Sequence, residues 1–255
     1  MATTAQLVRE WRGPAVLGFG FRPFYLLGAI WAALSMAWWI AALAGRAPTP
    51  ALYAPGDWHG HALLFGYTSA AITGFILTAV PNWTGRLPVV GWRLGALVLL
   101  WLAGRAGMSL PLPQVLAAAL DLALPTVLIA VLAREIIAGK NWRNLPVLGL
   151  IAGFAAAQAL FHAGAPQLAL RAGIGIAVLL ITLIGGRIIP SFTRNWLVRQ
   201  GEKALPAPPM ARFDLGVLGL SILALAGFIA GPLSMPTALL CALAGAAHLA
   251  RLSRW

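Results

Sequence analysis

The chain has 255 residues, of which 60% are hydrophobic and only 9% are charged, and its mean hydropathy is +0.85. Soluble domains carry about 25% charged residues, so this composition excludes a soluble globular protein and places the chain in a lipid bilayer. The net charge of +12 does not indicate nucleic-acid binding, because the cations lie in short segments between apolar runs, where they reflect membrane topology.

Eight apolar segments approach the length of about 20 residues that a membrane-spanning helix requires. They cover residues 24–44, 61–80, 93–110, 114–134, 145–163, 169–189, 213–231 and 236–252. Prolines stand at several boundaries, as expected where helices begin or end; they are Pro48, Pro81, Pro111, Pro146, Pro190 and Pro232. We therefore predict an all-α, polytopic membrane protein in which residues 1–255 form a single integral membrane domain.

The distribution of Lys and Arg predicts the orientation of these eight spans. With eight crossings, 15 of the 18 cationic side chains fall on the side that holds both termini, and only Arg46, Arg105 and Arg171 fall on the other. Cytoplasmic loops of membrane proteins carry an excess of Lys and Arg. Both termini are therefore expected in the cytoplasm, and the opposite side is called the outer side.

A weak internal similarity predicts a repeat. Pro81-Asn82-Trp83-Thr84 after the second span is similar to Pro190-Ser191-Phe192-Thr193 after the sixth, and at the same offset of 109 residues Gly66 matches Gly175. The repeated unit is four helices long, and an even number of helices preserves orientation. We therefore predict two parallel four-helix repeats, at residues 14–138 and 141–252.

The histidines are the candidate ligands. His59 and His61 begin the second span on the outer side, His162 ends the fifth span on the same side, and His248 lies in the eighth span nearer the cytoplasm. Imidazole binds haem iron and transition metals. Residues two apart on a helix point about 200° apart, so only one of His59 and His61 can face the bundle centre if both are helical. Two geometries stay open: a haem between His61 and His162, and a metal ion that also uses His59.

Other polar residues accompany these histidines. Arg105 ends the third span and Arg171 begins the sixth, where each either pairs with a haem propionate or extends to the membrane interface. Asp121 lies about two turns inside the fourth span, and Gln158 precedes His162 by one turn, where its amide is placed to orient that imidazole. Intramembrane acids are typically functional, although Asp121 and Gln158 can instead link helices.

The lone Cys241 is expected to be a packing residue.

Several motifs resemble those of the NnrS family. They are Gly20-Phe21-Arg22-Pro23-Phe24, Trp58-His59-Gly60-His61, the run GFILTAVPNWTGR from Gly74 to Arg86, Phe161-His162-Ala163-Gly164, the run RIIPSFTRN from Arg187 to Asn195, and His248-Leu249-Ala250-Arg251-Leu252. The resemblance covers nearly the whole chain. It implies a multi-pass protein of the bacterial inner membrane that binds haem b and copper and acts in tolerance to nitric oxide and nitrosative stress, often beside denitrification.

The resemblance also implies site residues and partners. It makes His59, His61, His162 and His248 candidate ligands, nitric oxide a candidate ligand of the cofactor, and a quinone or another redox protein a candidate partner. Two departures from the family pattern are present. Ala62 occupies a position where the family usually has an acid that would orient a ligand or move protons. The third family repeat, with its further histidines, is absent from this sequence.

Two alternative functions stay open. The first is a permease or channel for a small solute or a metal ion, which suits a repeat architecture with few buried charges and would use Asp121 and the histidines to line a path. The second is an electron-transfer subunit that passes electrons from quinol through haem. No sequence motif identifies a turnover reaction.

Overall fold

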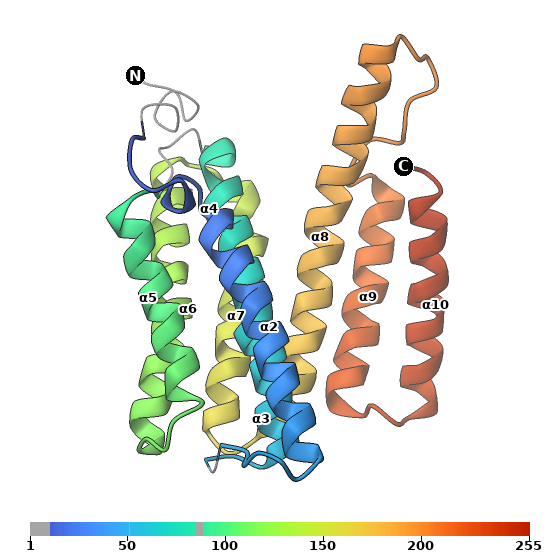
Figure 1. The fold of residues 1–255 in the computed structure, drawn as a ribbon. Coiled ribbons are helices and arrows are strands. Elements are labelled where there is room, and N and C mark those ends of the chain that lie inside the picture. The colour runs from blue at the N-terminus through green and yellow to red at the C-terminus, as the bar shows by residue number, and fades with distance from the viewer. Residues whose placement is uncertain (1–10, 51, 85–88) are drawn as a thin grey trace. The chain divides into compact units, whose positions relative to one another are not determined.

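The computed structural model describes residues 11–50, 52–84 and 89–255. These residues form an entirely helical structure without a β-strand, which confirms the predicted fold class (Figure 1). The chain divides into two compact units, Met1–Leu170 and Arg171–Trp255. This division does not coincide with the boundary between the predicted repeats near residue 140, so the repeat stays a prediction.

Each of the eight predicted spans corresponds to one continuous helical stretch. The first unit contains α2 (Phe21–Leu43), α3 (Pro55–His61), the π-helix η2 (Ala62–Thr68), α4 (Ser69–Thr84), α5 (Trp92–Gly107), α6 (Gln114–Ala138), α7 (Leu145–His162) and the short 3₁₀-helices η1 (Ala15–Leu17) and η3 (Trp142–Asn144). The helix α8 (Pro166–Gln200) begins in this unit and continues into the second, which also contains α9 (Arg212–Ala230) and α10 (Met235–Leu252). The segments α3, η2 and α4 follow one another directly and together form the second span.

Two helices continue past prolines that were expected to end them. Pro81 lies inside α4, and Pro190 lies inside α8, which continues to Gln200. The prediction that these two prolines mark helix ends is therefore wrong. A proline removes one helical hydrogen bond and bends the helix locally, and membrane helices commonly tolerate it because neighbouring groups satisfy the freed carbonyl.

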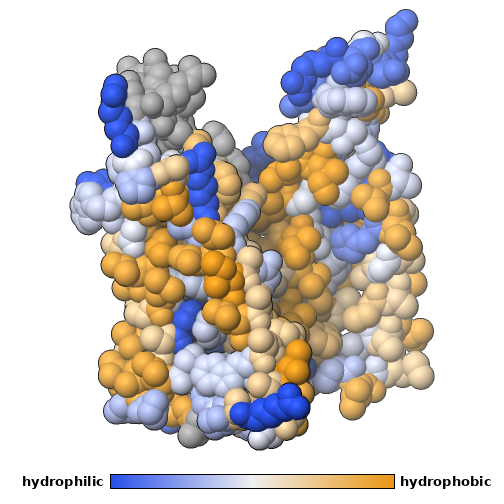
Figure 2. Space-filling model, viewed as in Figure 1, coloured by the Kyte–Doolittle hydropathy of each residue, from blue (hydrophilic) through white to orange (hydrophobic). Residues whose placement is uncertain are grey.

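The helices have the length and surface of a membrane protein. Seven of the described helical segments are long and apolar enough to cross a membrane. The eighth, α5, has 16 residues and a length of about 24 Å, a little less than the hydrocarbon core of about 30 Å. Figure 2 shows apolar side chains over most of the visible face of the helices, and large ones such as Leu99, Val115 and Ile181 are exposed. Lipid solvates such a surface, so the chain is an integral membrane protein.

Small residues bring α5 and α6 close together in the first unit. A Cβ atom on Gly104 would lie 3.1 Å from the Cα atom of Asp121, and one on Gly107 would lie 3.3 Å from the carbonyl oxygen of Ala117. Helices in membranes associate through such close backbone contacts. The close approach places Arg105, next to Gly104, within reach of Asp121.

A buried ion pair links α9 and α10 in the second unit. Arg251 Nε donates to Asp214 Oδ1 at 2.8 Å, and the two side chains are only 1% and 2% exposed. Arg251 Nη1 also donates to the carbonyl oxygen of Thr182 in α8 at 3.2 Å. A Cβ atom on Gly186 would overlap the guanidinium group, so this glycine provides the space that the arginine occupies.

We predict that Arg251→Leu destabilises the protein by about 3–5 kcal/mol, because it leaves the carboxylate of Asp214 buried without its counter-charge. The double variant Asp214→Leu/Arg251→Leu is expected to recover much of this loss, since no uncompensated charge remains. Thermal unfolding of the purified protein, followed by circular dichroism, measures both effects. Equal losses in the single and double variants would contradict this account of the pair.

Candidate metal centre

The carboxylate of Asp121 is the centre of a buried polar cluster in the first unit. Its Oδ2 atom accepts hydrogen bonds from Nε2 of His61 and from Nε2 of His162, each at 2.9 Å. The same oxygen accepts a bond from Nε2 of Gln158 at 2.7 Å. The other oxygen, Oδ1, accepts a bond from Nη2 of Arg105. With the side chain of Asp121 fully buried, these four donors replace the water that an exposed carboxylate would bind.

The junction between α3 and η2 and the ends of α5 and α7 bring the cluster together at one end of the unit. His61 is the last residue of α3, Arg105 lies in the last turn of α5, and His162 is the last residue of α7. Asp121 lies about two turns after the start of α6. In Figure 1, α3 and the connection between α5 and α6 lie at the same lower end of this unit.

The end of α7 follows from local sequence. Gly164 has a φ of +92°, a backbone conformation that glycine adopts without the steric cost that a Cβ atom brings. The carbonyl oxygen of His162, which has lost its helical partner, accepts a hydrogen bond from Nε2 of Gln114 at 3.1 Å. These two features end the helix at His162 and hold its imidazole beside α6.

Pro125 explains the second contact of Gln158. A proline has no backbone N–H, so the carbonyl group four residues earlier, that of Asp121, receives no helical hydrogen bond. Gln158 Nε2 donates to this carbonyl oxygen at 3.1 Å as well as to the carboxylate. The expectation that Gln158 orients His162 is therefore corrected. Both side chains project from the same face of α7 and donate to Asp121 rather than to each other.

Arg105 is buried rather than extended to the membrane interface. Its side chain is 5% exposed, and its guanidinium carbon lies 5.8 Å from the ring centroids of both Trp31 and Trp101. A Cβ atom on Gly66 would overlap this guanidinium group, so the glycine in η2 provides its space. Because Arg105 pairs with Asp121, the charges of the two side chains cancel, and the alternative of an interfacial arginine is wrong.

His59 and His61 point apart, as expected for residues two apart on a helix. The ring of His59 stacks on Trp39, with centroids 4.7 Å apart and planes at 10°. The ring of His61 is fully buried and packs against Phe65 and Phe161, at 5.3 and 4.7 Å. Only His61 of this pair therefore joins Asp121 and His162.

The other predicted site residues lie in the second unit and have their own partners. Arg171 Nε donates to the carbonyl oxygen of Ile229 at 3.1 Å. Nε2 of His248 lies 2.9 Å from Oγ of Ser221, whose hydroxyl proton is donated to the carbonyl oxygen of Val217. His248 must therefore donate from Nε2, which leaves Nδ1 as its acceptor nitrogen. The roles of Arg171 and His248 as cofactor residues stay predictions.

Tyr53 is a further member of the cluster that sequence reasoning missed. Its hydroxyl group lies 2.7 Å from Nδ1 of His162. Burial, and then the negative charge of Asp121, raise the pKa of the Tyr53 phenol above its usual value, so the hydroxyl keeps its proton at neutral pH. No local pattern marks Tyr53, because its partner is 109 residues away in the sequence.

The donor atoms of the cluster are those of a metal site. One ligand atom each from His61, Asp121 and His162 lie within 4.8 Å of one another. Two imidazoles and one carboxylate bind copper, zinc or non-haem iron. A haem held between His61 and His162 fits this arrangement less well, because both Nε2 atoms converge on one oxygen of Asp121 and a porphyrin would have to replace that side chain. The residues present therefore suit a metal ion.

We predict that Gly66→Ala destabilises the protein by about 3 kcal/mol, because the new methyl group displaces Arg105 from Asp121 and leaves both charges buried without a partner. Gly149→Ala is the matched control, since a Cβ atom on Gly149 would meet nothing within 4 Å. The midpoints of thermal unfolding in detergent compare the two variants. Equal midpoints would show that Gly66 is not needed for the pairing.

Comparison with known proteins identifies the family of the chain. No curated protein and no solved structure matches the chain significantly. The family model described as NnrS protein matches residues 15–255. This range contains the whole cluster and nearly the whole sequence, in agreement with the resemblance of the sequence motifs. The chain therefore belongs to the NnrS family.

Proposed function

We propose that this membrane protein binds a copper ion at His61, Asp121 and His162 and acts in the response to nitric oxide. The observation that carries the metal site is the convergence of three ligand atoms within 4.8 Å in a buried part of the first unit. Membership of the NnrS family supports copper as the metal and the response to nitric oxide as the role. When bound, copper would supply a redox-active metal ion to which nitric oxide can coordinate.

The hydrogen bonds of the cluster are compatible with both a metal-free state and a metal-bound state of His162. Without a metal, Nε2 of His162 carries the proton that it donates to Asp121, and Nδ1 accepts from Tyr53. A metal ion at Nε2 requires the ring proton to be on Nδ1, because a ligating nitrogen uses its lone pair. The hydroxyl of Tyr53 can then accept from Nδ1–H, so it holds the His162 ring in either state.

The surrounding residues fix the carboxylate ligand. Arg105 and Gln158 bond to Asp121 and are not themselves among the three ligands, so they keep its orientation when the imidazoles turn to the ion. Partners of this kind orient metal ligands and tune the affinity of the site. Arg105 also balances the charge of Asp121, so the ligand set contributes little net charge to the membrane interior.

We also propose that haem b binds at a position other than the metal centre. His59 is a candidate haem ligand in the first unit, because its Nδ1 atom is buried without a hydrogen-bond partner, and His248 is a separate candidate in the second unit, because its Nδ1 atom is an acceptor nitrogen. We also propose the bacterial inner membrane as the location, with both termini in the cytoplasm. The excess of Lys and Arg on the side of the termini supports this orientation.

We predict that His61→Ala and His162→Ala each abolish stoichiometric copper binding, since each removes one of three protein ligands. His59→Ala is the matched control, because the His59 ring stacks on Trp39 outside the cluster, and it is expected to retain copper. Elemental analysis of the purified, folded variants measures the metal. Full copper content in His61→Ala and His162→Ala would reject the proposed centre, and unimpaired nitric oxide tolerance of cells carrying these two variants would reject its role.

We predict that Tyr53→Phe weakens copper binding by roughly tenfold, because the His162 ring loses the hydroxyl that holds Nδ1. Tyr67→Phe, at a residue that is 41% exposed, serves as the control and is expected to bind copper as the wild type does. Competition with a chelator of known affinity measures the change. Identical affinities in the two variants would remove Tyr53 from the metal centre.

A further inference from the structure

A recess lies beside the metal centre, deeper in the first unit. It has a cavity volume of about 20 Å³, is partly open, and lies between α4, α6 and α7, and its walls include Thr73, Leu124, Leu128, Ile151 and Phe154. Leu124 follows Asp121 by one turn of α6, and Phe154 precedes His162 by about two turns of α7. We call this space the central recess.

The walls of the central recess offer almost no hydrogen bonds. The hydroxyl of Ser69 donates to the carbonyl oxygen of Gly66 at 2.9 Å, and the hydroxyl of Thr73 donates to the carbonyl oxygen of Ser69 at 2.7 Å. Both hydroxyl protons are therefore used within the helix, and the other walls are apolar. A stable buried water needs two to four polar partners, whereas dry apolar cavities accept gases such as xenon. The recess therefore selects against ions and strongly polar molecules.

Two aromatic rings connect the wall of the central recess with the metal centre. Phe65 is fully buried, and its ring centroid lies 5.3 Å from that of His61 and 5.2 Å from that of Phe154, which lines the recess. The rings of Phe154 and Phe65 therefore form a continuous line of contacts from the wall of the recess to the His61 ring. Rotations of buried aromatic rings and small shifts of helices are within the ordinary range of protein motion.

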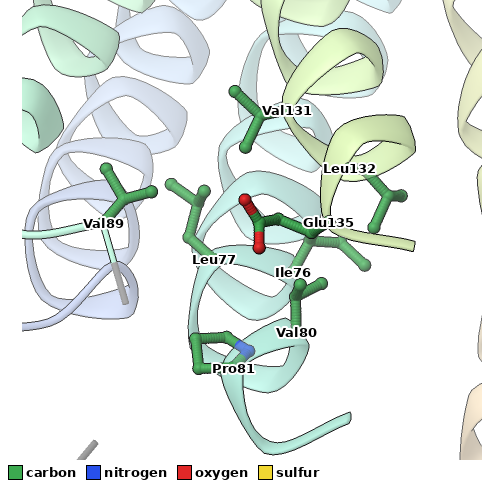
Figure 3. A pocket seen from close by; sticks show the side chains of 8 residues that line it. All are labelled: Ile76, Leu77, Val80, Pro81, Val89, Val131, Leu132 and Glu135. Atoms are coloured by element: carbon green, nitrogen blue, oxygen red, sulfur yellow. The ribbon is translucent and has the colours of Figure 1, made fainter. Parts of the chain in front are cut away.

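A second recess lies further along α4 and α6. It has a cavity volume of about 20 Å³, and its walls include Leu77, Val80, Leu132 and Glu135 (Figure 3). Leu132 follows Leu128 of the central recess by one turn of α6, and Leu77 follows Thr73 by one turn of α4. The two recesses therefore lie in sequence along the seam between α4 and α6. Figure 3 shows that apolar side chains of these helices surround the Glu135 side chain in the second recess.

We propose that the central recess is a binding site for a small uncharged molecule of the diatomic-gas class, and that this molecule reaches the metal centre from there. The size and the dry, apolar lining of the recess determine the class of ligand. The identification of the molecule as nitric oxide rests on the proposed function. Such molecules dissolve readily in the hydrocarbon of a membrane, so the surrounding lipid can supply them to the seam between α4 and α6.

Xenon tests the recess without any metal. Crystals of the protein under xenon pressure are expected to show xenon in the central recess of the wild type and of Leu128→Ala, which enlarges it, and none in Leu128→Phe, which fills it. Val127→Phe is the matched control on the same helix, because Val127 is 36% exposed and does not line the recess; this variant is expected to bind xenon. A wild-type recess without xenon, or xenon that persists in Leu128→Phe, would overturn the proposal.

The rate of nitric oxide binding tests the connection to the metal. In copper-loaded protein, stopped-flow measurements are expected to show association slowed by roughly tenfold in Leu128→Phe, the effect of an added side chain in a packed passage. Association in Val127→Phe should equal that of the wild type, with the same copper content in all three proteins. Equal rates in both variants would reject the recess as the way to the metal. A protein that binds xenon but no copper would instead refute the proposed metal centre and leave the gas site standing.

Discussion

A carboxylate buried in a membrane protein has to be fully paired, and the arrangement of the first unit follows from this requirement at Asp121. An isolated charge in such surroundings is costly, and removal of its counter-charge leaves that cost uncompensated. Arg105 supplies the opposite charge, and His61, His162 and Gln158 supply the remaining donors. Because these donors come from α3, α5 and α7, one side chain of α6 fixes the positions of three other helical segments.

Residues without functional groups make this pairing possible. Gly104 lets α5 approach α6, and Gly66 leaves room for the Arg105 guanidinium group. Pro125 frees the backbone carbonyl of Asp121, which then binds Gln158. The second unit uses a similar arrangement, in which Gly186 makes room for Arg251 beside Asp214. In both units a glycine on one helix therefore accommodates an arginine whose partner is an aspartate on another.

The proposed metal site and the proposed gas site make different demands on their surroundings. The proposed ion needs ligand atoms that converge, and those of His61, Asp121 and His162 lie within 4.8 Å of one another. The gas needs a dry path, and the helices beyond Phe65 provide apolar walls in which the hydroxyls of Ser69 and Thr73 are bonded to their own helix. Polar groups thus concentrate around Asp121, while the adjoining recess stays apolar.

The sequence by itself determined the features that repeat along the chain or act locally. Long apolar runs predicted eight helical segments, seven of which are long and apolar enough to cross a membrane. The helical step predicted that His59 and His61 point apart, and a dense set of motifs identified the family. Only the tertiary structure decided which polar residues meet. His61 and Asp121 are 60 residues apart, Asp121 and His162 are 41 apart, and Tyr53 and His162 are 109 apart. Helical periodicity specifies which side chains share a face of one helix, but it does not specify which face of another helix lies opposite. That choice depends on close backbone contacts, such as those of Gly66 and Gly104, and on the need to pair one buried carboxylate.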